Sequence, residues 1–561
     1  MKLFKKPLLI LFIIVIIASV LRIYNLGNVP ASLNWDEVSL GYNAYSILKT
    51  GADEYGKYLP AVLQSYDDYK PALYTYLTIP SVFVFGLTEA AVRLPSALSG
   101  ISAVVIVYYL VLSILGNKKI LVGKKEIAVS LVALLSSFFL AISPWHIQFS
   151  RIAFESNVGL TLNLLGFLLF LKALKKPYLL PVSFIIFTLN IHMYQSDRVF
   201  TPLLLGALCV IFYKRLLKLK KIFLISAVCA FVVAFPLLFY IVTNQNALLR
   251  AKGVSVFSDQ TVLARSSNKL LYDNAENNLI GKVLDNRRVE FGKAFVSGYI
   301  SHFDPNWLFI TGDIARHHAP YMGLLYIFTA PFILIGIYTM VFLKIDIKYK
   351  LSFFAYFLLV PIPASVTTGV PHAVRTLNFV WTYELFIALG ILATITFVLT
   401  LKNNFAKYAF LLLSAIYLLL SIVNIGYYLS QYFVQLNYYN AVDWMYGYKQ
   451  AISYVEEQRP KYDKVIVENE VPFDQSYMFF LFYLKVDPSY YQKLGGTVSG
   501  GYKEKHRGFF NYTFESVKQS KYAGRNLYVG KEGDMPKDST IKKIIYYPDG
   551  AKAIVIAEHE N

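Results

Sequence analysis

Cysteine is almost absent from this chain of 561 residues, which has only Cys209 and Cys229, both inside apolar runs. The polar region after residue 430 has none, so disulfides do not hold it together, and both thiols are expected to pack as small hydrophobes. Acidic residues are scarce in the middles of the apolar runs. Because ion-coupled transporters usually keep ionisable groups near the bilayer midplane, this scarcity argues against that class. Glu384 is the main exception, and it lies near the end of its run.

The excess of basic residues does not indicate nucleic-acid binding. The chain has 54 Lys and Arg against 35 Asp and Glu, a formal charge of +19. Residues 431–561 are close to neutral, with 17 basic and 16 acidic residues. The excess lies in short loops between apolar runs, where membrane topology explains it, and no basic stripe accompanies a recognised nucleic-acid fold. We therefore expect no nucleic-acid partner.

Hydrophobic residues make up 56% of the chain, above the 45–50% or so of soluble domains, which indicates a membrane protein. Runs of about 20 apolar residues mark transmembrane helices. The run at 72–87 contains Pro80 and predicts an interfacial or re-entrant helix, with an extra span as the alternative. The sequence predicts about eleven spans, near 7–22, 94–115, 127–143, 157–173, 178–194, 199–213, 222–243, 321–343, 350–368, 377–400 and 407–427.

The loops between these runs fall into two alternating sets. One set is short and rich in lysine, which is typical of cytoplasmic loops. The other set includes the long loops 23–93 and 244–320 and the C-terminal region. We therefore expect a multi-pass protein of the plasma membrane with a cytoplasmic N-terminus and an extracytoplasmic C-terminal region. The alternative for the first apolar run is a cleaved signal peptide.

Two domains are expected: residues 1–430 form the transmembrane domain, and residues 431–561 form a small α/β domain. In the second, residues 440–457 predict an amphipathic helix, and 464–468 and 526–529 predict strands. Residues 541–547 and 551–557 predict a hairpin around Pro548-Asp549-Gly550. The region has no nucleophile elbow, metal-ligand spacing or phosphate loop.

Polar residues that suit chemistry recur in the outer loops. The first outer loop contains Asn34-Trp35-Asp36-Glu37, in which two neighbouring carboxylates repel each other, so partial burial raises the pKa of at least one. That suits a general base, while the second acid orients a partner. The alternative is a helix N-terminus, where acids offset the macrodipole. Lys70 precedes a rigid proline and is placed to hold a lipid phosphate, unless it only snorkels at the membrane boundary.

Further candidates in the outer loops are Arg93 and the pair of Arg151 and Glu155. The alternative for Arg93 is an anchor for a helix at the membrane interface. The alternative for Arg151 and Glu155 is an intrahelical salt bridge, which their spacing also suits. Arg198 is another candidate, and its alternative role is to cap the following helix together with the neighbouring Asp197.

The long loop 244–320 offers Trp307, Asp313 and His317, which suit a substrate lid better than a metal site, because the His and Asp spacing matches no metal signature. His372 and Arg375 lie at another outer helix junction and suit a phosphate or pyrophosphate.

The sequence resembles the polytopic glycosyltransferases of the GT-C superfamily. The resemblance rests on Trp35-Asp36-Glu37, on Lys70-Pro71-Ala72-Leu73-Tyr74 and on Arg93-Leu94-Pro95-Ser96, and it covers roughly residues 1–430. The most similar branch is glycosyltransferase family 39, with the protein O-mannosyltransferases and the lipid A aminoarabinose transferases. The family often has Lys-Pro-Pro where this chain has Lys-Pro-Ala. The C-terminal region is not the β-trefoil of the eukaryotic mannosyltransferases.

The resemblance implies an enzyme that transfers a hexosyl or pentosyl group from a polyprenyl phosphate to an acceptor hydroxyl, with inversion. Asp36 matches the family's base, Glu37 the second acid of that motif, and Lys70 a lysine that contacts the donor phosphate. Arg375, His372 and Arg93 are expected to add phosphate contacts. Arg151, Glu155, Arg198, Trp307, Asp313 and His317 are expected to bind substrate.

Several features of the reaction stay open. The acceptor is a glycan, lipid or protein, no cofactor is certain, and no residue is assigned to a metal, although a divalent metal is left open because oligosaccharyltransferases of the wider superfamily use one. Two rival functions remain at this point. One is a lipid-linked sugar transporter or flippase, and the other is a non-catalytic cell-surface assembly factor.

Overall fold

The computed structural model describes residues 6–66, 68–116, 118–123, 125–244, 253–498, 505–506 and 508–560. The chain divides into two compact units. We call Met1–Arg22, Ser99–Phe149 and Glu155–Tyr428 the helical unit. Ile23–Leu98, Ser150–Phe154 and Leu429–Asn561 form the other, which we call the mixed unit because it combines helices with a sheet.

The helical unit is built almost entirely from helices, with one small hairpin of β3 (Lys119–Val122) and β4 (Lys125–Ala128). The short segments η3 (Val256–Ser258), η4 (Trp307–Thr311), η5 (Ile327–Thr329) and η6 (Leu377–Phe379) interrupt the connections. Its helices are α1 (Pro7–Ile23), the later part of α4 (Glu89–Leu115), α5 (Val129–Ile142), α6 (Pro144–Ser150), α7 (Glu155–Ala173), α8 (Leu179–Asn190), α9 (Asp197–Ile211), α10 (Tyr213–Lys218), α11 (Lys220–Thr243), α13 (Gln260–Ala275), α14 (Leu279–Leu284), α15 (Arg287–Ser301), α16 (Ala330–Phe342), α17 (Ile347–Leu359), α18 (Ile362–Ser365), α19 (Val380–Thr400) and α20 (Asn404–Ser430).

The tightest helix pair in this unit is α16 with α19. A Cβ atom at Gly336 would lie 1.9 Å from the carbonyl oxygen of Phe386, and one at Gly390 would lie 2.0 Å from that of Phe332. Only glycine fits at such distances, so these two positions let the helix backbones approach each other, as small residues commonly do in membranes. The helix α19 also packs against α5, and α8 packs between α7 and α11.

The predicted spans coincide with helices at all eleven ranges. Among the described residues, six helices are long and apolar enough to cross a membrane: Glu89–Leu115, Glu155–Ala173, Lys220–Thr243, Ile347–Ser365, Leu377–Thr400 and Asn404–Tyr439. The bent pair of α5 and α6, with 59° between its helices, adds a seventh if it counts as one span. The other predicted spans correspond to shorter helices, namely α1, α8, α9 and η5 with α16.

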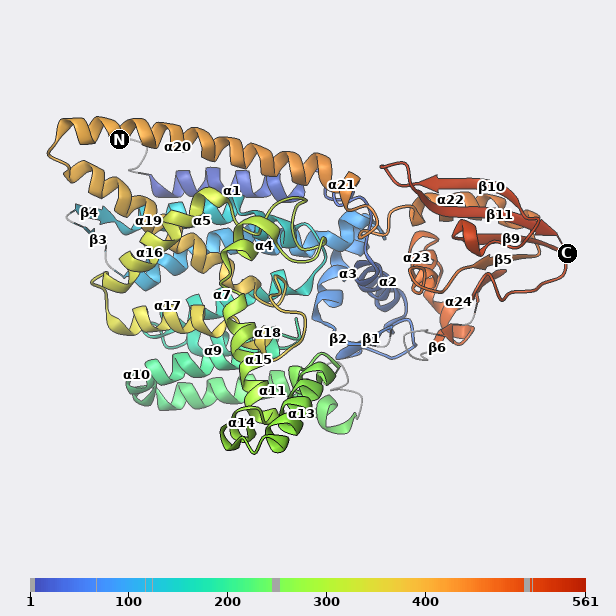
Figure 1. Ribbon diagram of the computed structural model, residues 1–561, viewed down its shortest axis with the longest axis horizontal. Coiled ribbons are helices and arrows are strands. Elements are labelled where there is room, and N and C mark those ends of the chain that lie inside the picture. The colour runs from blue at the N-terminus through green and yellow to red at the C-terminus, as the bar shows by residue number, and fades with distance from the viewer. Residues whose placement is uncertain are drawn as a thin grey trace. The chain divides into compact units, whose positions relative to one another are not determined.

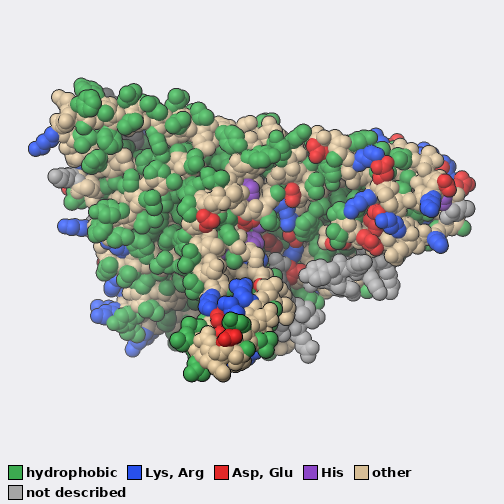
Figure 2. Space-filling model, in the orientation of Figure 1, with side chains coloured by type: hydrophobic (Ala, Val, Ile, Leu, Met, Phe, Trp, Pro, Cys, Tyr) green, Lys and Arg blue, Asp and Glu red, His purple; other side chains and the backbone are tan. Residues whose placement is uncertain are grey.

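The apolar surface of the helical unit lies largely on the outside. Within the most apolar stretch of each helix, only 6% of the residues are buried for the helix that contains α20, and only 11% for α11. Figure 2 shows hydrophobic side chains covering α20. Soluble proteins rarely expose such continuous apolar patches, whereas lipid covers them in a membrane. The chain is a multi-pass membrane protein.

Most of the lysine-rich connections of the helical unit gather at one end of its helices. The β3–β4 hairpin, α10, the turn between α16 and α17, and the turn between α19 and α20 all lie at this end (Figure 1). Because α16 and α19 each end at the lysine-rich connections, the connections before α16 and before α19 lie at the other ends of these two helices. These two connections contain residues 312–326 and 366–376.

The mixed unit begins with α2 (Trp35–Thr50), the hairpin of β1 (Val62–Ser65) and β2 (Asp68–Pro71), and α3 (Leu73–Phe85). At 13 residues, α3 is shorter than the 20 or so needed to cross the hydrocarbon core. The C-terminal part contains the short segments η7 (Gln431–Gln435), η8 (Arg459–Lys461) and η9 (Glu532–Asp534), and the helices α21 (Leu436–Tyr439), α22 (Tyr448–Gln458), α23 (Ser476–Tyr483) and α24 (Pro488–Lys493).

The C-terminal strands confirm the predicted α/β region. A five-stranded sheet has the order β10-β11-β9-β5-β8, with β5 parallel to both of its neighbours and the β10–β11–β9 ladder antiparallel. Its strands are β5 (Lys464–Val467), β8 (Tyr512–Phe514), β9 (Arg525–Gly530), β10 (Thr540–Tyr546) and β11 (Lys552–Glu560), and β6 (Thr497–Val498) pairs separately with β7 (Lys505–His506). The sequence predicted β5, β9 and the β10–β11 hairpin but missed the three-residue β8.

The predicted helix at 440–457 is wrong in its first half. The helix α22 begins at Tyr448, because Gly447 has a φ of 108° that helices do not allow. Residues 441–447 form turns instead, and they place Trp444 in the core with no exposed surface.

Polar contacts join α2 to the C-terminal part of the mixed unit, where α2 packs against α23 and α24. The buried carboxylate of Glu54 accepts hydrogen bonds from Asn43 Nδ2 at 3.1 Å, Thr497 Oγ1 at 2.7 Å and the Tyr477 hydroxyl at 3.2 Å. Tyr42 donates to the Val486 carbonyl at 3.1 Å. These contacts fix α2 and the residues just after it relative to the sheet-bearing region.

Candidate active site

The predicted acids lie in the first turn of α2, where the local sequence specifies a helix start. The Asn34 side chain accepts from the Glu37 amide at 3.1 Å, and the Asn34 amide donates to Glu37 Oε2 at 3.1 Å. This reciprocal pair is a capping box, encoded by the Asn-x-x-Glu spacing. The capping box fixes the directions of the Asp36 and Glu37 side chains, because the Glu37 carboxylate must turn back toward the Asn34 amide inside the protein.

Glu37 is completely buried and forms an ion pair with Arg93, which is also completely buried. Arg93 Nε lies 2.9 Å from Glu37 Oε1 and Arg93 Nη2 lies 3.1 Å from Glu37 Oε2, while the Ala153 amide donates to Oε1 at 2.8 Å. The remaining Arg93 N–H groups donate to the carbonyls of Leu26, Pro30 and Ser32.

All five N–H donors of a guanidinium are thus used inside the protein. Arg93 was predicted to bind the donor phosphate, but these contacts leave it no donor for a phosphate and assign it to holding Glu37 in place.

Asp36 points the other way and pairs with Lys70. Lys70 Nζ donates to Asp36 Oδ1, with 30% of the Asp36 side chain and 11% of the Lys70 side chain exposed. Lys70 lies on β2 opposite Leu63, and its ammonium is 5.8 Å from the centre of the Tyr66 ring. The β1–β2 hairpin therefore places the Lys70 ammonium beside Asp36, which is the solvent-accessible carboxylate of the Asp-Glu pair.

The predicted helical pair of Arg151 and Glu155 does not form on one helix. The helix α6 ends at Ser150 and α7 begins at Glu155, so Arg151 lies in the connection between them. The Arg151 guanidinium is buried, donates to the Val29 carbonyl at 3.0 Å and lies 4.8 Å from the centre of the Phe433 ring. These contacts make Arg151 part of the core of the mixed unit, and Glu155 begins a helix of the helical unit.

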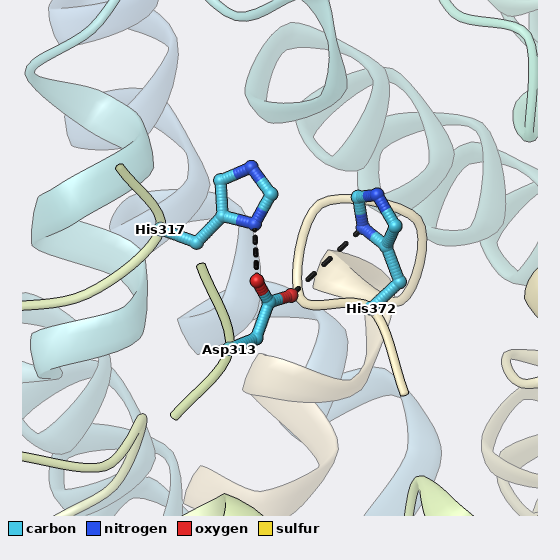
Figure 3. A group of neighbouring side chains, drawn as sticks. All are labelled: Asp313, His317 and His372. Carbon is cyan, nitrogen blue, oxygen red and sulfur yellow. Dashed lines mark hydrogen bonds and ion pairs between the residues drawn. The ribbon is translucent and has the colours of Figure 1, made fainter. Parts of the chain in front are cut away.

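A second group of predicted residues meets in the helical unit. His317 Nδ1 lies 2.7 Å from Asp313 Oδ1, and His372 Nδ1 lies 4.0 Å from Asp313 Oδ2. Figure 3 shows the Asp313 carboxylate between the two imidazole rings, with one Nδ1 atom facing it from each side. His372 comes from a connection some 60 residues further along the chain, so spacing in the sequence could not reveal the cluster.

Neighbouring groups fix this cluster. The Ala373 amide donates to Asp313 Oδ2 at 2.5 Å, and the Trp145 indole donates to the Ala373 carbonyl at 3.2 Å. His302 Nε2 accepts from the His372 amide at 3.2 Å. No signal in the sequence revealed the part that His302 has in placing His372.

The electrostatics of the cluster keep the carboxylate charged and the rings neutral. Burial would raise the pKa of Asp313, but the hydrogen bond from His317 and the nearby rings lower it well below its usual value. Burial lowers the pKa of His317 and, together with the Arg375 charge, that of His372. Burial also lowers the pKa of His302 to about 4. At neutral pH the cluster thus offers one carboxylate and two neutral imidazoles.

The remaining predicted residues take separate places in the helical unit. Arg375 donates to the Thr368 carbonyl at 2.8 Å and to the Thr367 hydroxyl. Trp307 is buried against the rings of Trp145 and His302. Arg198 donates to Gln195 at 2.7 Å, and it is half-buried.

The structure is that of a polytopic membrane protein with a GT-C fold and a C-terminal α/β region. Its structure is similar to that of ArnT from Cupriavidus metallidurans, bound to undecaprenyl phosphate or in the apo state, with a TM-score of 0.51, 10% sequence identity, and coverage of 98% of this chain and 97% of that chain. No family model matches the sequence, and no curated protein matches it.

A second solved structure matches less closely. The oligosaccharyltransferase of Archaeoglobus fulgidus, tethered to an acceptor peptide, has a TM-score of 0.48 and 14% identity over 86% of this chain. The chain spans 64% of the length of that protein.

Proposed function

We propose that the protein is a membrane glycosyltransferase that moves a monosaccharide from a polyprenyl phosphate to an acceptor hydroxyl. The GT-C fold supports this class, and ArnT, with which the chain shares that fold over almost its whole length, binds undecaprenyl phosphate. A polyprenyl phosphate is a good leaving group, so cationic side chains can stabilise the departing charge.

We place the reaction at the outer face of the membrane. The lysine-rich connections gather at one end of the helical unit, and positively charged loops favour the cytoplasm. The N-terminus of α1 belongs to that end, and the connections with Asp313 and His372 belong to the opposite one.

The proposal rests on the different environments of two neighbouring carboxylates. Glu37 is buried and fully engaged, whereas Asp36 remains accessible and faces a lysine. A general base must reach the proton that it removes, so Asp36 is the candidate and Glu37 is a positioning residue. Lys70 balances the charge of the Asp36 carboxylate.

The proposed reaction is a single displacement. The acceptor oxygen attacks C1 of the sugar from the face opposite the phosphate, its proton passes to Asp36, and the bond between C1 and the phosphate oxygen breaks. Polyprenyl phosphate leaves with the bonding electrons, and the Lys70 ammonium stabilises its charge. One displacement inverts the configuration at C1.

The test compares Asp36→Asn with Asp68→Asn in membranes supplied with labelled polyprenyl-phosphate sugar. Asp68 lies on the same strand as Lys70, two residues away, so it is a matched carboxylate outside the proposed machinery. We expect Asp36→Asn to slow transfer by about 10²–10⁴-fold and Asp68→Asn to leave it nearly unchanged.

Three results would contradict the proposal. Transfer at the wild-type rate by Asp36→Asn would remove the base. Donor movement across vesicles without a new glycosidic bond would indicate a flippase. A phenotype that depends on residues 431–561 but not on Asp36 would indicate an assembly factor.

A further inference from the structure

One carboxylate and two imidazoles converge in the helical unit, away from Asp36 and Lys70 in the sequence. One ligand atom from each of Asp313, His317 and His372 can be chosen so that all three lie within 4.8 Å of one another. A tetrahedral zinc ion with ligands at about 2.0–2.1 Å holds its ligand atoms about 3.3 Å apart. Small side-chain rotations therefore bring the three atoms to that spacing.

The second observation is an unsatisfied nitrogen. His372 Nδ1 is inaccessible to solvent and has no hydrogen-bond partner among the described residues. It nevertheless faces the Asp313 carboxylate across 4.0 Å, a distance too long for a hydrogen bond and suited to an atom lying between them (Figure 3). Native structures rarely leave a buried ring nitrogen unpaired, so the gap calls for an explanation such as an ion.

The surroundings of the three residues resemble the outer shell of a metal site. The Ala373 amide holds one carboxylate oxygen, and the Ile314 amide donates to the other. The His302 ring accepts from the His372 amide. Such contacts orient ligands before a metal binds, and they are typical of the groups around metal ligands.

From these observations we propose that Asp313, His317 and His372 bind one divalent zinc ion. Two imidazoles and one carboxylate suit zinc better than magnesium or calcium, which prefer oxygen ligands. Three protein ligands leave a fourth tetrahedral position open for water or for an oxygen of a substrate. The ion would tie the connection before α16 to the connection before α19, a role that does not depend on sugar transfer.

The test measures metal content directly. The full-length protein is purified in detergent with its affinity tag removed, because a polyhistidine tag binds zinc itself. Zinc per chain is then measured by mass spectrometry after dialysis, for wild type, His317→Gln, His372→Gln and Asp313→Ala. His559→Gln, which changes a histidine of β11, is the matched control.

We expect about one zinc per chain in wild type and in His559→Gln, and a loss of zinc affinity by more than about 100-fold in the three ligand variants, since loss of a mere outer-shell partner already costs 10–100-fold. Cobalt should replace zinc and give the visible absorption of a four-coordinate site in wild type but not in His372→Gln. Magnesium and calcium should not compete.

A stability readout covers the case in which a ligand variant fails to fold. A chelator should lower the melting temperature of the wild-type protein, and added zinc should restore it. Wild-type protein without zinc, or equal zinc in all three ligand variants, would overturn the proposal. Asp36→Asn should retain zinc while it loses transfer, so the failure of one proposal is distinguishable from the failure of the other.

Discussion

The buried ion pair of Glu37 and Arg93 gives the sharpest prediction about stability. The Glu37→Gln substitution keeps the size of the side chain and one carbonyl oxygen, but it removes the charge that faces the guanidinium. The new amide would direct N–H groups toward Arg93 Nη2 or the Asn34 amide, which are themselves donors. Arg93 would then keep its hydrogen bonds to three backbone carbonyls and lose its ion pair with the Glu37 carboxylate.

The expected cost follows from the burial of both groups, neither of which has exposed side-chain surface. Breaking a buried ion pair on one side costs about 3–5 kcal/mol, because an uncompensated charge stays in the interior. For a chain of 561 residues that unfolds as one unit, that corresponds to a fall in melting temperature of about 3–4 °C. Replacing both partners, Glu37→Gln with Arg93→Gln, should cost less than the sum of the single changes, because no charge is then left unpaired.

The assay is thermal unfolding of the purified protein in detergent, followed by size-exclusion chromatography after heating. The control is Glu89→Gln, which breaks a pair with Lys449 at 2.8 Å whose lysine is 59% exposed. That pair should contribute only about 0–1 kcal/mol. Equal small shifts for Glu37→Gln and Glu89→Gln would refute the reasoning that burial makes the first pair essential.

Three further predictions concern other parts of the chain. Gly312 has a φ of 64°, and a Cβ there would lie 2.6 Å from the His318 ring, so Gly312→Ala should destabilise the protein by about 1–3 kcal/mol in thermal unfolding. Gly426→Ala, with open space around the Cβ, should not destabilise it. Glu54→Ala removes the acceptor of three buried hydrogen bonds and should cost about 3 kcal/mol, with faster hydrogen exchange in α23 as the measurement that checks it. The hydrogen bond from Arg525 lowers the pKa of Glu558 to about 2, so Glu558 stabilises the sheet above its unfolded pKa near 4.5, and this stabilisation is lost as pH falls from there toward 2. Glu558→Gln should therefore speed exchange in β11 at pH 7 by an amount equivalent to about 1 kcal/mol and have little effect near pH 2, whereas an equal effect at both pH values would contradict the assignment.

Local patterns predicted most of the secondary structure. Apolar runs gave the eleven helical ranges, since length and hydropathy are properties of a continuous segment. Alternating apolar residues around Pro548-Asp549-Gly550 gave the β10–β11 hairpin for the same reason. The start of α22 was missed because Gly447 and the turns before it depend on the packing of Trp444 in the core.

The candidate site was predictable only in part. Asp36 and Lys70 were both predicted as site residues within the loop 23–93, and the β1–β2 hairpin brings them together. The burial of Arg93 and its five internal hydrogen bonds depend on three carbonyls from a different segment, and spacing does not reveal them. The approach of His372 to Asp313 likewise depends on how α16 and α19 are connected in space.

Transfer of labelled sugar by the purified protein in liposomes tests the central claim most directly. The donor is a polyprenyl-phosphate sugar of defined anomeric configuration, and the acceptor is an extract of the cell envelope. The account predicts that wild-type protein forms a glycosidic bond of inverted configuration and releases polyprenyl phosphate, while Asp36→Asn retains the fold and loses the reaction. A product of retained configuration, or full activity of Asp36→Asn, would contradict it.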